Sequence, residues 1–191
     1  MMKNEIRKEL LDVRKNMSKK DVISLSKQIQ KRLFELDEFK NADTILFYVS
    51  YGNEVFTHDM IKDCLKKKRN VIVPISDEEN KKLILSKLEK WTDLSKGAYH
   101  ILEPKKEKIN ETSVFEIDLV IVPGVCFDLH GCRIGHGEGY YDGLLKDSTN
   151  AAHIGLAYEN QIIEEVPIES HDIPVDKIIT EDRVIDCIQV I

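Results

Sequence analysis

The sequence predicts an α/β protein built around a mostly parallel sheet. Short apolar runs rich in β-branched residues alternate with helix-type patterns along the chain, and this alternation is typical of parallel strands joined by right-handed crossovers. The length of 191 residues suits one domain that buries about 70% of the surface of its unfolded chain. We therefore expect residues 1–191 to form a single-domain three-layer α/β/α sandwich with a Rossmann-like sheet.

Two helices are predicted at the start of the chain. Residues 3–17 carry apolar side chains three or four positions apart, namely Ile6, Leu10, Val13 and Met17. Ser18 and Asp21 can form a capping box for a second helix, whose apolar face is Val22, Leu25, Ile29 and Leu33. Lys3 and Arg7 project together from the first turns. That pair suits either a solvated charged face or an anionic ligand.

Strands and helices then alternate to the end of the chain. The expected elements are a strand at 45–50, a helix capped by Thr57, a strand at 70–75, a polar turn at 76–82, a strand at 83–88, an irregular stretch at 96–104, a polar exposed segment at 105–116, a strand at 117–122, a helix from 140, and strands at 152–158, 177–180 and 184–191. The strand at 83–88 is expected to be antiparallel because the turn before it is short.

The most informative stretch follows the strand at 117–122. Gly135, Gly137 and Gly139 alternate with larger residues, so the backbone can turn its N–H groups toward an anion without interfering side chains. If a helix opens at Tyr140, its free N–H groups and its dipole face the same point. The pattern indicates a phosphate site, with a purely structural turn as the alternative.

Two charged residues flank these glycines. Arg133 offers a planar fork that suits phosphate, and Asp142 offers a hard oxygen ligand that suits magnesium. No Gly-Lys-Ser/Thr follows the loop, and the glycine spacing differs from the dinucleotide fingerprint. We therefore interpret the stretch as a nucleotide phosphate site of another kind.

Composition narrows the classes of function. The net charge of −6 argues against a general nucleic-acid binder. No apolar run is long enough to span a bilayer, and the opening residues are too charged for a signal peptide, so we expect no membrane partner. The four cysteines show no metal-binding spacing, and Cys126 and Cys132, which flank the glycine stretch, are interpreted as buried small hydrophobes. A reducing cytoplasm is the expected location.

The whole string around the glycines resembles the 5-formyltetrahydrofolate cyclo-ligase family. The matching positions are Pro123-Gly124, Phe127-Asp128, Gly131, Arg133-Ile134-Gly135, Gly137, Gly139-Tyr140-Tyr141-Asp142 and Leu145. The resemblance extends over nearly the whole chain. Its other fragments are Lys3 with Arg7, FYVSYGNE with Glu54, Gly97 to Pro104, Gly155-Leu156-Ala157, Gln161, Pro167, Glu169, His171-Asp172 and Thr180-Glu181.

The resemblance implies an enzyme that uses ATP and Mg²⁺ to convert 5-formyltetrahydrofolate to 5,10-methenyltetrahydrofolate. A formamide oxygen is a poor leaving group, so the γ-phosphoryl group of ATP would activate it before N10 attacks the carbon. Phosphoryl transfer asks a protein chiefly for positioning and charge stabilisation, and no covalent nucleophile is needed. The implied partners are small molecules, ATP and a reduced folate, and the implied assembly is a monomer or weak homodimer.

Residue roles follow from the resemblance by position. It implies ATP binding by Lys3, Asn4, Glu5, Ile6, Arg7, Arg133, Ile134, Gly135, His136, Gly137, Glu138, Gly139, Tyr140 and Tyr141. It implies substrate binding by Val49, Glu54, His136, Gly137, Glu138, Gly139 and Tyr140. The implied catalytic residues are Arg133 and Tyr140, and the implied magnesium ligands are Asp142 and Asp172.

Two departures and two alternatives accompany this interpretation. Glu138 stands where the family often has Gly or a basic residue, and Gly143 replaces the usual Arg after Tyr-Tyr-Asp. The first alternative is a non-catalytic regulatory protein that binds ATP and folate. The second is an α/β enzyme acting on phosphorylated sugars or acyl groups, for which only Glu54 and Glu103 offer a catalytic base.

Overall fold

A seven-stranded sheet forms the centre of the protein. The computed structural model describes residues 2–97 and 100–187. The strand order is β11-β10-β9-β6-β1-β2-β3, with β10, β9, β6, β1 and β2 parallel and the edge strands β11 and β3 antiparallel. The strands are β1 (Thr44–Leu46), β2 (Asn70–Asp77), β3 (Lys82–Leu88), β6 (Leu119–Val122), β9 (Ala152–Leu156), β10 (Lys177–Ile179) and β11 (Val184–Asp186).

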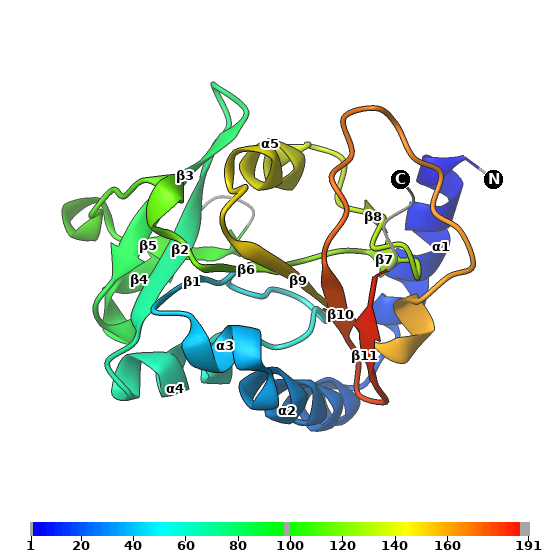
Figure 1. Cartoon of the computed structure of the whole chain (residues 1–191), viewed down its shortest axis with the longest axis horizontal. Helices are drawn as coiled ribbons and strands as arrows, with labels where there is room; N and C mark the ends of the chain where they lie inside the picture. Colours follow the sequence, from blue (N-terminus) through cyan, green and yellow to red (C-terminus); the bar gives the residue numbers. More distant parts are fainter. Residues whose placement is uncertain (1, 98–99, 188–191) are drawn as a thin grey trace.

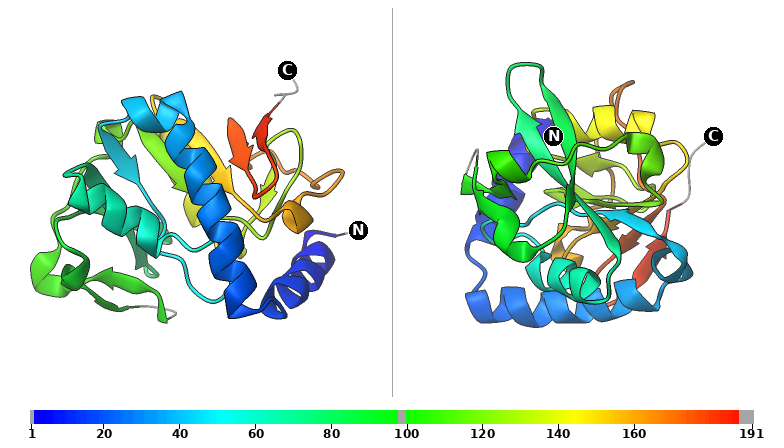
Figure 2. Two further views of the ribbon diagram at one scale, coloured as in Figure 1. Left: turned by 90° about the horizontal axis from the view of Figure 1, so that it is seen from below. Right: turned by 90° about the vertical axis from the view of Figure 1, so that its left-hand side faces the viewer.

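Helices cover both faces of this sheet, which confirms the expected three layers. Figure 1 shows α2 (Lys19–Glu35), α3 (Asp37–Asn41) and α4 (His58–Lys66) below the sheet and α5 (Tyr140–Asp147) above it. The first helix, α1 (Lys3–Lys15), lies beside a small hairpin of β7 (Cys126–Phe127) and β8 (Arg133–Ile134). Figure 2 shows the long helix α2 crossing one face of the molecule.

The alternation of side chains along the strands builds two cores. Ile45, Leu119 and Ile121 pack with α2, α3 and α4 on one face, and Leu46 and Val120 pack with α5 on the other. Every residue of β6 is buried, as expected for a strand covered on both faces. This central position places the carboxyl end of β6 in the middle of one sheet edge.

Several predicted elements are confirmed. Ser18 caps α2 by accepting a hydrogen bond from the backbone N–H of Asp21 at 3.1 Å. Strand β3 is antiparallel to β2 after a short turn, and α5 begins at Tyr140. Residues 105–116 are mostly exposed and contain the 3₁₀ turns η3 (Lys106–Lys108) and η4 (Val114–Glu116).

The first helix contains an error of the sequence prediction. Val13, expected on its apolar face, is 43% exposed, whereas Arg14 is buried. The Arg14 side chain donates a hydrogen bond to the carbonyl oxygen of Gly124 at 3.3 Å. This contact turns Arg14 inward, because the carbonyl satisfies a charged group that would otherwise stay in water.

Four other expectations need correction. Thr57 precedes α4 but does not cap it, because its hydroxyl donates to the carbonyl of Tyr48 at 2.7 Å. The stretch at 96–104 is more regular than expected, with a hairpin of β4 (Leu94–Lys96) and β5 (Leu102–Pro104). Strand β1 ends at residue 46, earlier than predicted. The predicted strand at 184–191 extends to residue 186, and its last four residues lie outside the described ranges.

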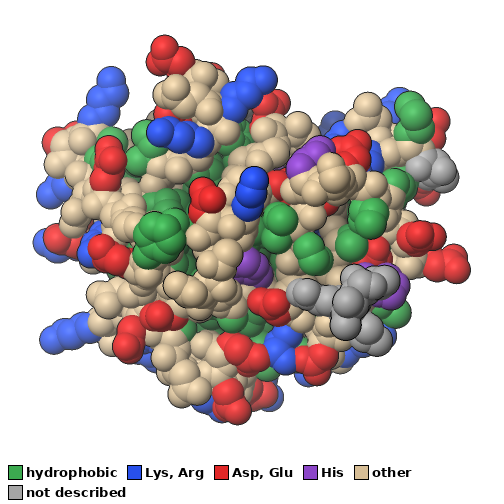
Figure 3. Space-filling model, turned by 45° about the horizontal axis from the view of Figure 1, so that its top comes forward, with side chains coloured by type: hydrophobic (Ala, Val, Ile, Leu, Met, Phe, Trp, Pro, Cys, Tyr) green, Lys and Arg blue, Asp and Glu red, His purple; other side chains and the backbone are tan. Residues whose placement is uncertain are grey.

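The surface and the helices show the following features. The face drawn in Figure 3 carries acidic and basic side chains mixed with small apolar groups. Among residues 2–97 and 100–187, no helix has the length and apolar character that crossing a membrane requires.

Candidate active site

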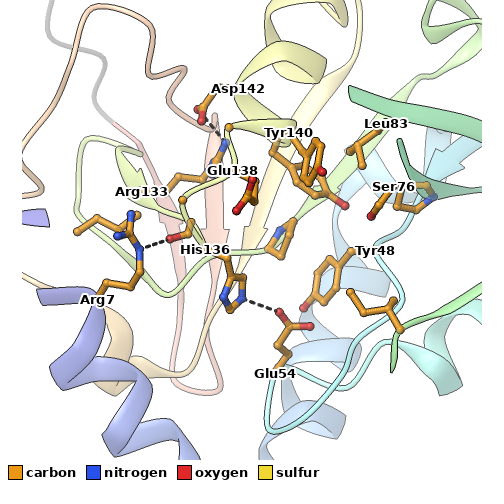
Figure 4. A pocket seen from close by; sticks show the side chains of 18 of the residues that line it. Arg7, Tyr48, Glu54, Ser76, Leu83, Arg133, His136, Glu138, Tyr140 and Asp142 are labelled. Carbon is orange, nitrogen blue, oxygen red and sulfur yellow. Dashed lines mark hydrogen bonds and ion pairs between the residues drawn. The ribbon is translucent and has the colours of Figure 1, made fainter. Parts of the chain in front are cut away.

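A cavity of about 410 Å³ opens at the carboxyl end of the parallel strands. Its wall includes Tyr48 and Val49 after β1, Ser76 near the end of β2, and Pro123 directly after β6. In parallel sheets this edge is where ligands bind, because the loops that follow the strands converge there. The loop between β8 and α5 covers one side of the cavity (Figure 4).

The glycine loop and α1 meet at one end of the cavity. Arg7 donates from Nε to the carbonyl oxygen of Gly135 at 2.8 Å. Gly137 and Gly139 have φ values of +108° and +73°, which side chains rarely tolerate. A Cβ on Gly137 would lie 3.6 Å from the Arg7 guanidinium. The glycines therefore bring bare backbone and a cation together, an arrangement that suits phosphate oxygens.

Arg133 lies on β8 beside this loop. Its side chain is 5% exposed, and Nη2 lies 2.9 Å from Oδ1 of Asp142 in the first turn of α5. Its buried Nε has no hydrogen-bond partner among the described residues. Burial lowers the pKa of Arg133, although the Asp142 carboxylate supports the charged form. A buried guanidinium that lines the cavity and is held in place by a carboxylate suits an anionic ligand.

A third cation, Lys3, lines the cavity from α1. Lys3 Nζ is 2.5 Å from Oδ2 of Asp172 and 3.4 Å from Oε2 of Glu169. Burial lowers the pKa of Lys3, but the hydrogen bond and attraction from Asp172 outweigh it, so the pKa is raised. Burial likewise acts to raise the pKa of Asp172, and the hydrogen bond from Lys3 lowers it overall.

Glu54 lines the cavity beside His136 of the glycine loop. Its side chain is buried, and Oε2 accepts a hydrogen bond from the backbone N–H of Tyr51 at 3.0 Å. Nε2 of His136 lies 3.4 Å from the other carboxylate oxygen, as Figure 4 shows. The Tyr158 hydroxyl donates to the carbonyl oxygen of Glu54 at 3.0 Å and fixes the loop. The carboxylate is therefore held in place with acceptor capacity remaining.

Apolar side chains line a further part of the cavity. Tyr48, Pro74, Leu83 and Ile101 line it, and Glu103 stabilises it by accepting a hydrogen bond from the backbone N–H of Ser76 at 3.0 Å. The sequence analysis did not predict that Tyr48, Pro74, Ser76, Leu83 or Ile101 would line the cavity. It named Glu103, but as a possible catalytic base. Tyr48 and Tyr51 could have been predicted to line the cavity, because both lie within six residues of Glu54 in the sequence.

Most of the residues named from the sequence lie around this one cavity. They are Lys3, Arg7, Val49, Glu54, Arg133, Ile134, Gly135, His136, Gly137, Glu138, Gly139, Tyr140, Tyr141, Asp142 and Asp172. Asn4, Glu5 and Ile6 do not line it. Asn4 accepts a hydrogen bond from Arg7 at 2.5 Å, Glu5 accepts one from the backbone N–H of Met2, and Ile6 packs in a small core. Their side chains support α1.

The two carboxylates expected to bind magnesium also lie at the cavity. Asp142 is paired with Arg133 and Asp172 with Lys3. The ligand atoms of Glu169, His171 and Asp172 lie within 4.8 Å of one another. Carboxylate oxygens of this kind fit a magnesium ion that also takes ligands from phosphates.

Comparisons with known proteins agree with the geometry. The family model described as the 5-formyltetrahydrofolate cyclo-ligase family matches residues 1–181. The mouse 5-formyltetrahydrofolate cyclo-ligase is 27% identical over 94% of this chain and 94% of its own, and a probable 5-formyltetrahydrofolate cyclo-ligase of Schizosaccharomyces pombe is 30% identical over 97% and 98%.

A solved structure has the same fold. The NMR structure of Aquifex aeolicus 5,10-methenyltetrahydrofolate synthetase matches with a TM-score of 0.86 and 34% identity, covering 97% of this chain and 93% of that one. The sequence match and the structural match both span nearly the whole chain. This protein therefore belongs to the 5-formyltetrahydrofolate cyclo-ligase family.

Proposed function

We propose that the protein catalyses the ATP-dependent conversion of 5-formyltetrahydrofolate to 5,10-methenyltetrahydrofolate, acting as one domain over residues 1–191. The observation that carries this proposal is one cavity that combines three cations and a glycine-rich loop with the buried carboxylate of Glu54 and an apolar wall. Such a cavity suits two ligands, one bound through phosphates and one through a flat ring, with their reacting groups side by side. The names of the relatives supply the reaction.

The cationic part of the cavity is the proposed site of the ATP phosphates. Lys3, Arg7 and Arg133 supply positive charge, and the loop from Gly135 to Gly139 supplies backbone N–H groups. Arg133 is the residue best suited to the γ-phosphoryl group, because its guanidinium is buried and held by Asp142. Removing one preorganised donor from such a site typically costs about 3 kcal/mol of transition-state stabilisation.

The part of the cavity around Glu54 is the proposed site of the folate. Glu54 presents a buried carboxylate, which suits the N–H donors at the edge of a pterin ring. Tyr48, Val49 and Leu83 supply apolar contacts for the flat ring system. Tyr140 lines the same cavity, and we place it beside the reacting groups of the two ligands.

The proposed reaction has two chemical steps. The formyl oxygen attacks the γ-phosphorus of ATP, the bond to the β-phosphate oxygen breaks, and ADP leaves. The N10 lone pair then attacks the formyl carbon, the carbon–oxygen bond breaks, and phosphate leaves with the former formyl oxygen. Loss of the N10 proton gives the methenyl cation. The protein's contribution is to orient the two ligands and to stabilise charge on the phosphoryl oxygens.

Magnesium has a proposed place near the phosphates. Asp142 and Asp172 would hold it, and the ion would supply charge neutralisation for the phosphate oxygens when bound. Both carboxylates have cationic partners in the structure, so the ion would share these oxygens with Lys3 and Arg133, and the phosphates would offset the added positive charge. We further propose a cytoplasmic monomer or weak homodimer; the four free cysteines suit a reducing compartment.

The proposal is tested by following the methenyl product by its absorbance. We expect product only when ATP, Mg²⁺ and 5-formyltetrahydrofolate are all present, and none after chelation with EDTA. Omission of each component in turn is the control. Formation of product at full rate in EDTA would refute the magnesium site. Tight binding of both ligands without product would favour the non-catalytic alternative.

A further inference from the structure

The side chain of Asn53 joins two segments that line the cavity and are distant in the sequence. Its amide nitrogen lies 2.9 Å from the carbonyl oxygen of Arg14, 3.2 Å from that of Lys15 and 3.0 Å from that of Met17. The last carbonyl groups of a helix have no partner within the helix, so a donor from elsewhere or water has to satisfy them. Asn53 therefore caps the carboxyl end of α1 from the loop that follows β1.

The same loop holds the carboxylate of Glu54. Residues 51–54 form a tight turn, in which the backbone N–H of Glu54 donates to the carbonyl oxygen of Tyr51 at 3.2 Å and Gly52 has a φ of +55°. The Glu54 carboxylate in turn accepts a hydrogen bond from the backbone N–H of Tyr51 at 3.0 Å. Asn53 lies inside this turn, so a displacement of Asn53 also displaces the carboxylate.

The other end of α1 carries cations that line the cavity. One of them, Arg7, lies about 12 Å along the helix axis from the last residue of α1. Arg7 donates to the carbonyl oxygen of Gly135 at 2.8 Å, and the next residue, His136, lies 3.4 Å from the Glu54 carboxylate. Together with Asn53, these contacts close a ring that runs from α1 to the glycine loop, to Glu54 and back to α1.

We propose that Asn53 is a positioning residue that fixes the carboxylate of Glu54 relative to the cations of α1. This inference rests on the proposed function, in which Glu54 holds the folate and α1 contributes to the phosphate site. Each ligand has contacts of its own, and Asn53 sets the distance between the formyl oxygen and the γ-phosphorus. Such placement governs the rate, because a misplacement of about 1 Å can cost on the order of a hundredfold in turnover.

Other contacts hold each segment in the fold without Asn53. The Tyr158 hydroxyl donates to the backbone carbonyl of Glu54 at 3.0 Å, which attaches the loop to the segment that follows β9. The buried side chain of Arg14 donates to the carbonyl oxygen of Gly124 at 3.3 Å, which attaches α1 to the segment that follows β6. Loss of the Asn53 contacts should therefore leave both ligand sites intact and release only their relative placement.

The kinetic experiment uses Asn53→Ala, which removes the donor, and Asn53→Ser, which keeps a polar side chain but shortens it by one bond. Gln30→Ala is the matched control, because the Gln30 amide bridges α2 to Asp63 of α4 away from the cavity. With saturating ATP, Mg²⁺ and 5-formyltetrahydrofolate, both Asn53 variants are expected to lose about tenfold or more in kcat. Calorimetric affinity for each ligand alone should change by less than about threefold, and Gln30→Ala should keep the parent kcat.

Hydrogen exchange without ligands tests the link itself. The backbone N–H groups of Tyr51 and Glu54 are both bonded within the turn. In Asn53→Ala they are expected to exchange at least about threefold faster than in the parent protein, because the turn has lost its attachment to α1. In Gln30→Ala their exchange should match that of the parent.

Several outcomes would overturn the inference. An unchanged kcat in the folded Asn53 variants, or unchanged exchange in the turn, would mean that Asn53 does not position Glu54. Affinity for either ligand that falls as far as kcat, or failure of both variants to fold, would make the role of Asn53 structural. An equal loss of kcat in Gln30→Ala would trace the effect to stability. Absence of methenyl product from the parent protein would instead refute the proposed function, so the parent assayed in parallel separates the two failures.

Discussion

The carboxylate of Asp142 holds the guanidinium of Arg133 with a distance of 2.9 Å between Oδ1 and Nη2. Asp142 is in the first turn of α5 and Arg133 is on β8, so the ion pair joins both ends of the glycine loop. The two side chains are 20% and 5% exposed. Removing either partner would leave the other charge partly buried and unpaired, which is strongly destabilising. The pair therefore fixes both the glycine loop and the orientation of the Arg133 guanidinium.

Replacing Arg133 by Lys keeps the charge and removes the planar fork. We predict that Arg133→Lys lowers kcat by more than about tenfold, or about 1.4 kcal/mol, while the affinity for ATP falls less. Steady-state kinetics and calorimetric ATP binding test this. Arg32→Lys is a matched control, because Arg32 also forms a planar contact, to the carbonyl of Glu181, but away from the cavity. An intact kcat, or a loss of affinity alone, would exclude the transition-state role.

The cations of α1 offer a second prediction. We expect the double variant Lys3→Ala with Arg7→Ala to bind ATP at least about tenfold more weakly, because two phosphate contacts are lost. Its unfolding temperature should fall by no more than about 3 °C, since the ion pair of Lys3 and the hydrogen bonds of Arg7 are partly exposed and contribute little. The control is Lys8→Ala with Lys15→Ala, which removes two exposed charges from the same helix. Equal ATP affinity in the two double variants would show that Lys3 and Arg7 do not contact the nucleotide.

Glu54 is predicted to distinguish the two ligands. Glu54→Gln keeps the shape of the side chain and removes its charge, so folate binding should weaken about tenfold, or about 1.4 kcal/mol. The affinity for ATP should change by less than about twofold, which calorimetry with each ligand separately will measure. Parallel loss of both ligands would instead indicate that the Tyr51 N–H and His136 contacts have collapsed with the loop.

The pair of Lys3 and Asp172 has a predictable pH dependence. The lowered pKa of Asp172 means that its stabilisation is present above the ordinary carboxyl pKa of about 3.9 and is lost as pH falls below it. The raised pKa of Lys3 means that its contribution persists below about 10.4 and is lost as pH rises beyond its folded-state value. The pair should therefore contribute a constant amount between about pH 5 and pH 9.5.

Thermal unfolding of the parent protein and of Lys3→Ala at a series of pH values tests this expectation. The difference in unfolding temperature should be flat through neutral pH and should shrink below about pH 4. The series is best repeated in a His171→Gln background, because Nε2 of His171 lies 3.8 Å from Asp172. A difference that changes between pH 6 and pH 8 in that background would contradict the assignment of the pair.

Local patterns in the sequence were sufficient for much of this fold. The β-branched run of β6 and the capping residue Ser18 carry their own signals, and both elements were predicted. The burial of Arg14 instead of Val13 on α1 was not predicted, because it depends on a distant acceptor, the carbonyl oxygen of Gly124. Helical periodicity contains no information about such an acceptor.

Part of the candidate site could likewise be predicted from the sequence, and part could not. The glycine loop and Arg133 are contiguous in sequence, so their chemistry could be interpreted locally. The apolar wall could not be predicted locally, because Pro74 and Leu83 belong to different strands, and only the pairing of strands in the sheet brings them to the same cavity as the loop. The contact of Asn53 with α1 also needed the structure, since only the fold brings the loop after β1 to the end of that helix.

An isotope label on the formyl oxygen shows whether ATP phosphorylates that oxygen, which is the step that the proposed cavity couples to cleavage of ATP. The substrate would carry ¹⁸O in its formyl group, and the released phosphate would be analysed by mass spectrometry. We predict one ¹⁸O atom in the phosphate for each methenyl product formed. Unlabelled phosphate, with the ¹⁸O recovered in water, would contradict the account.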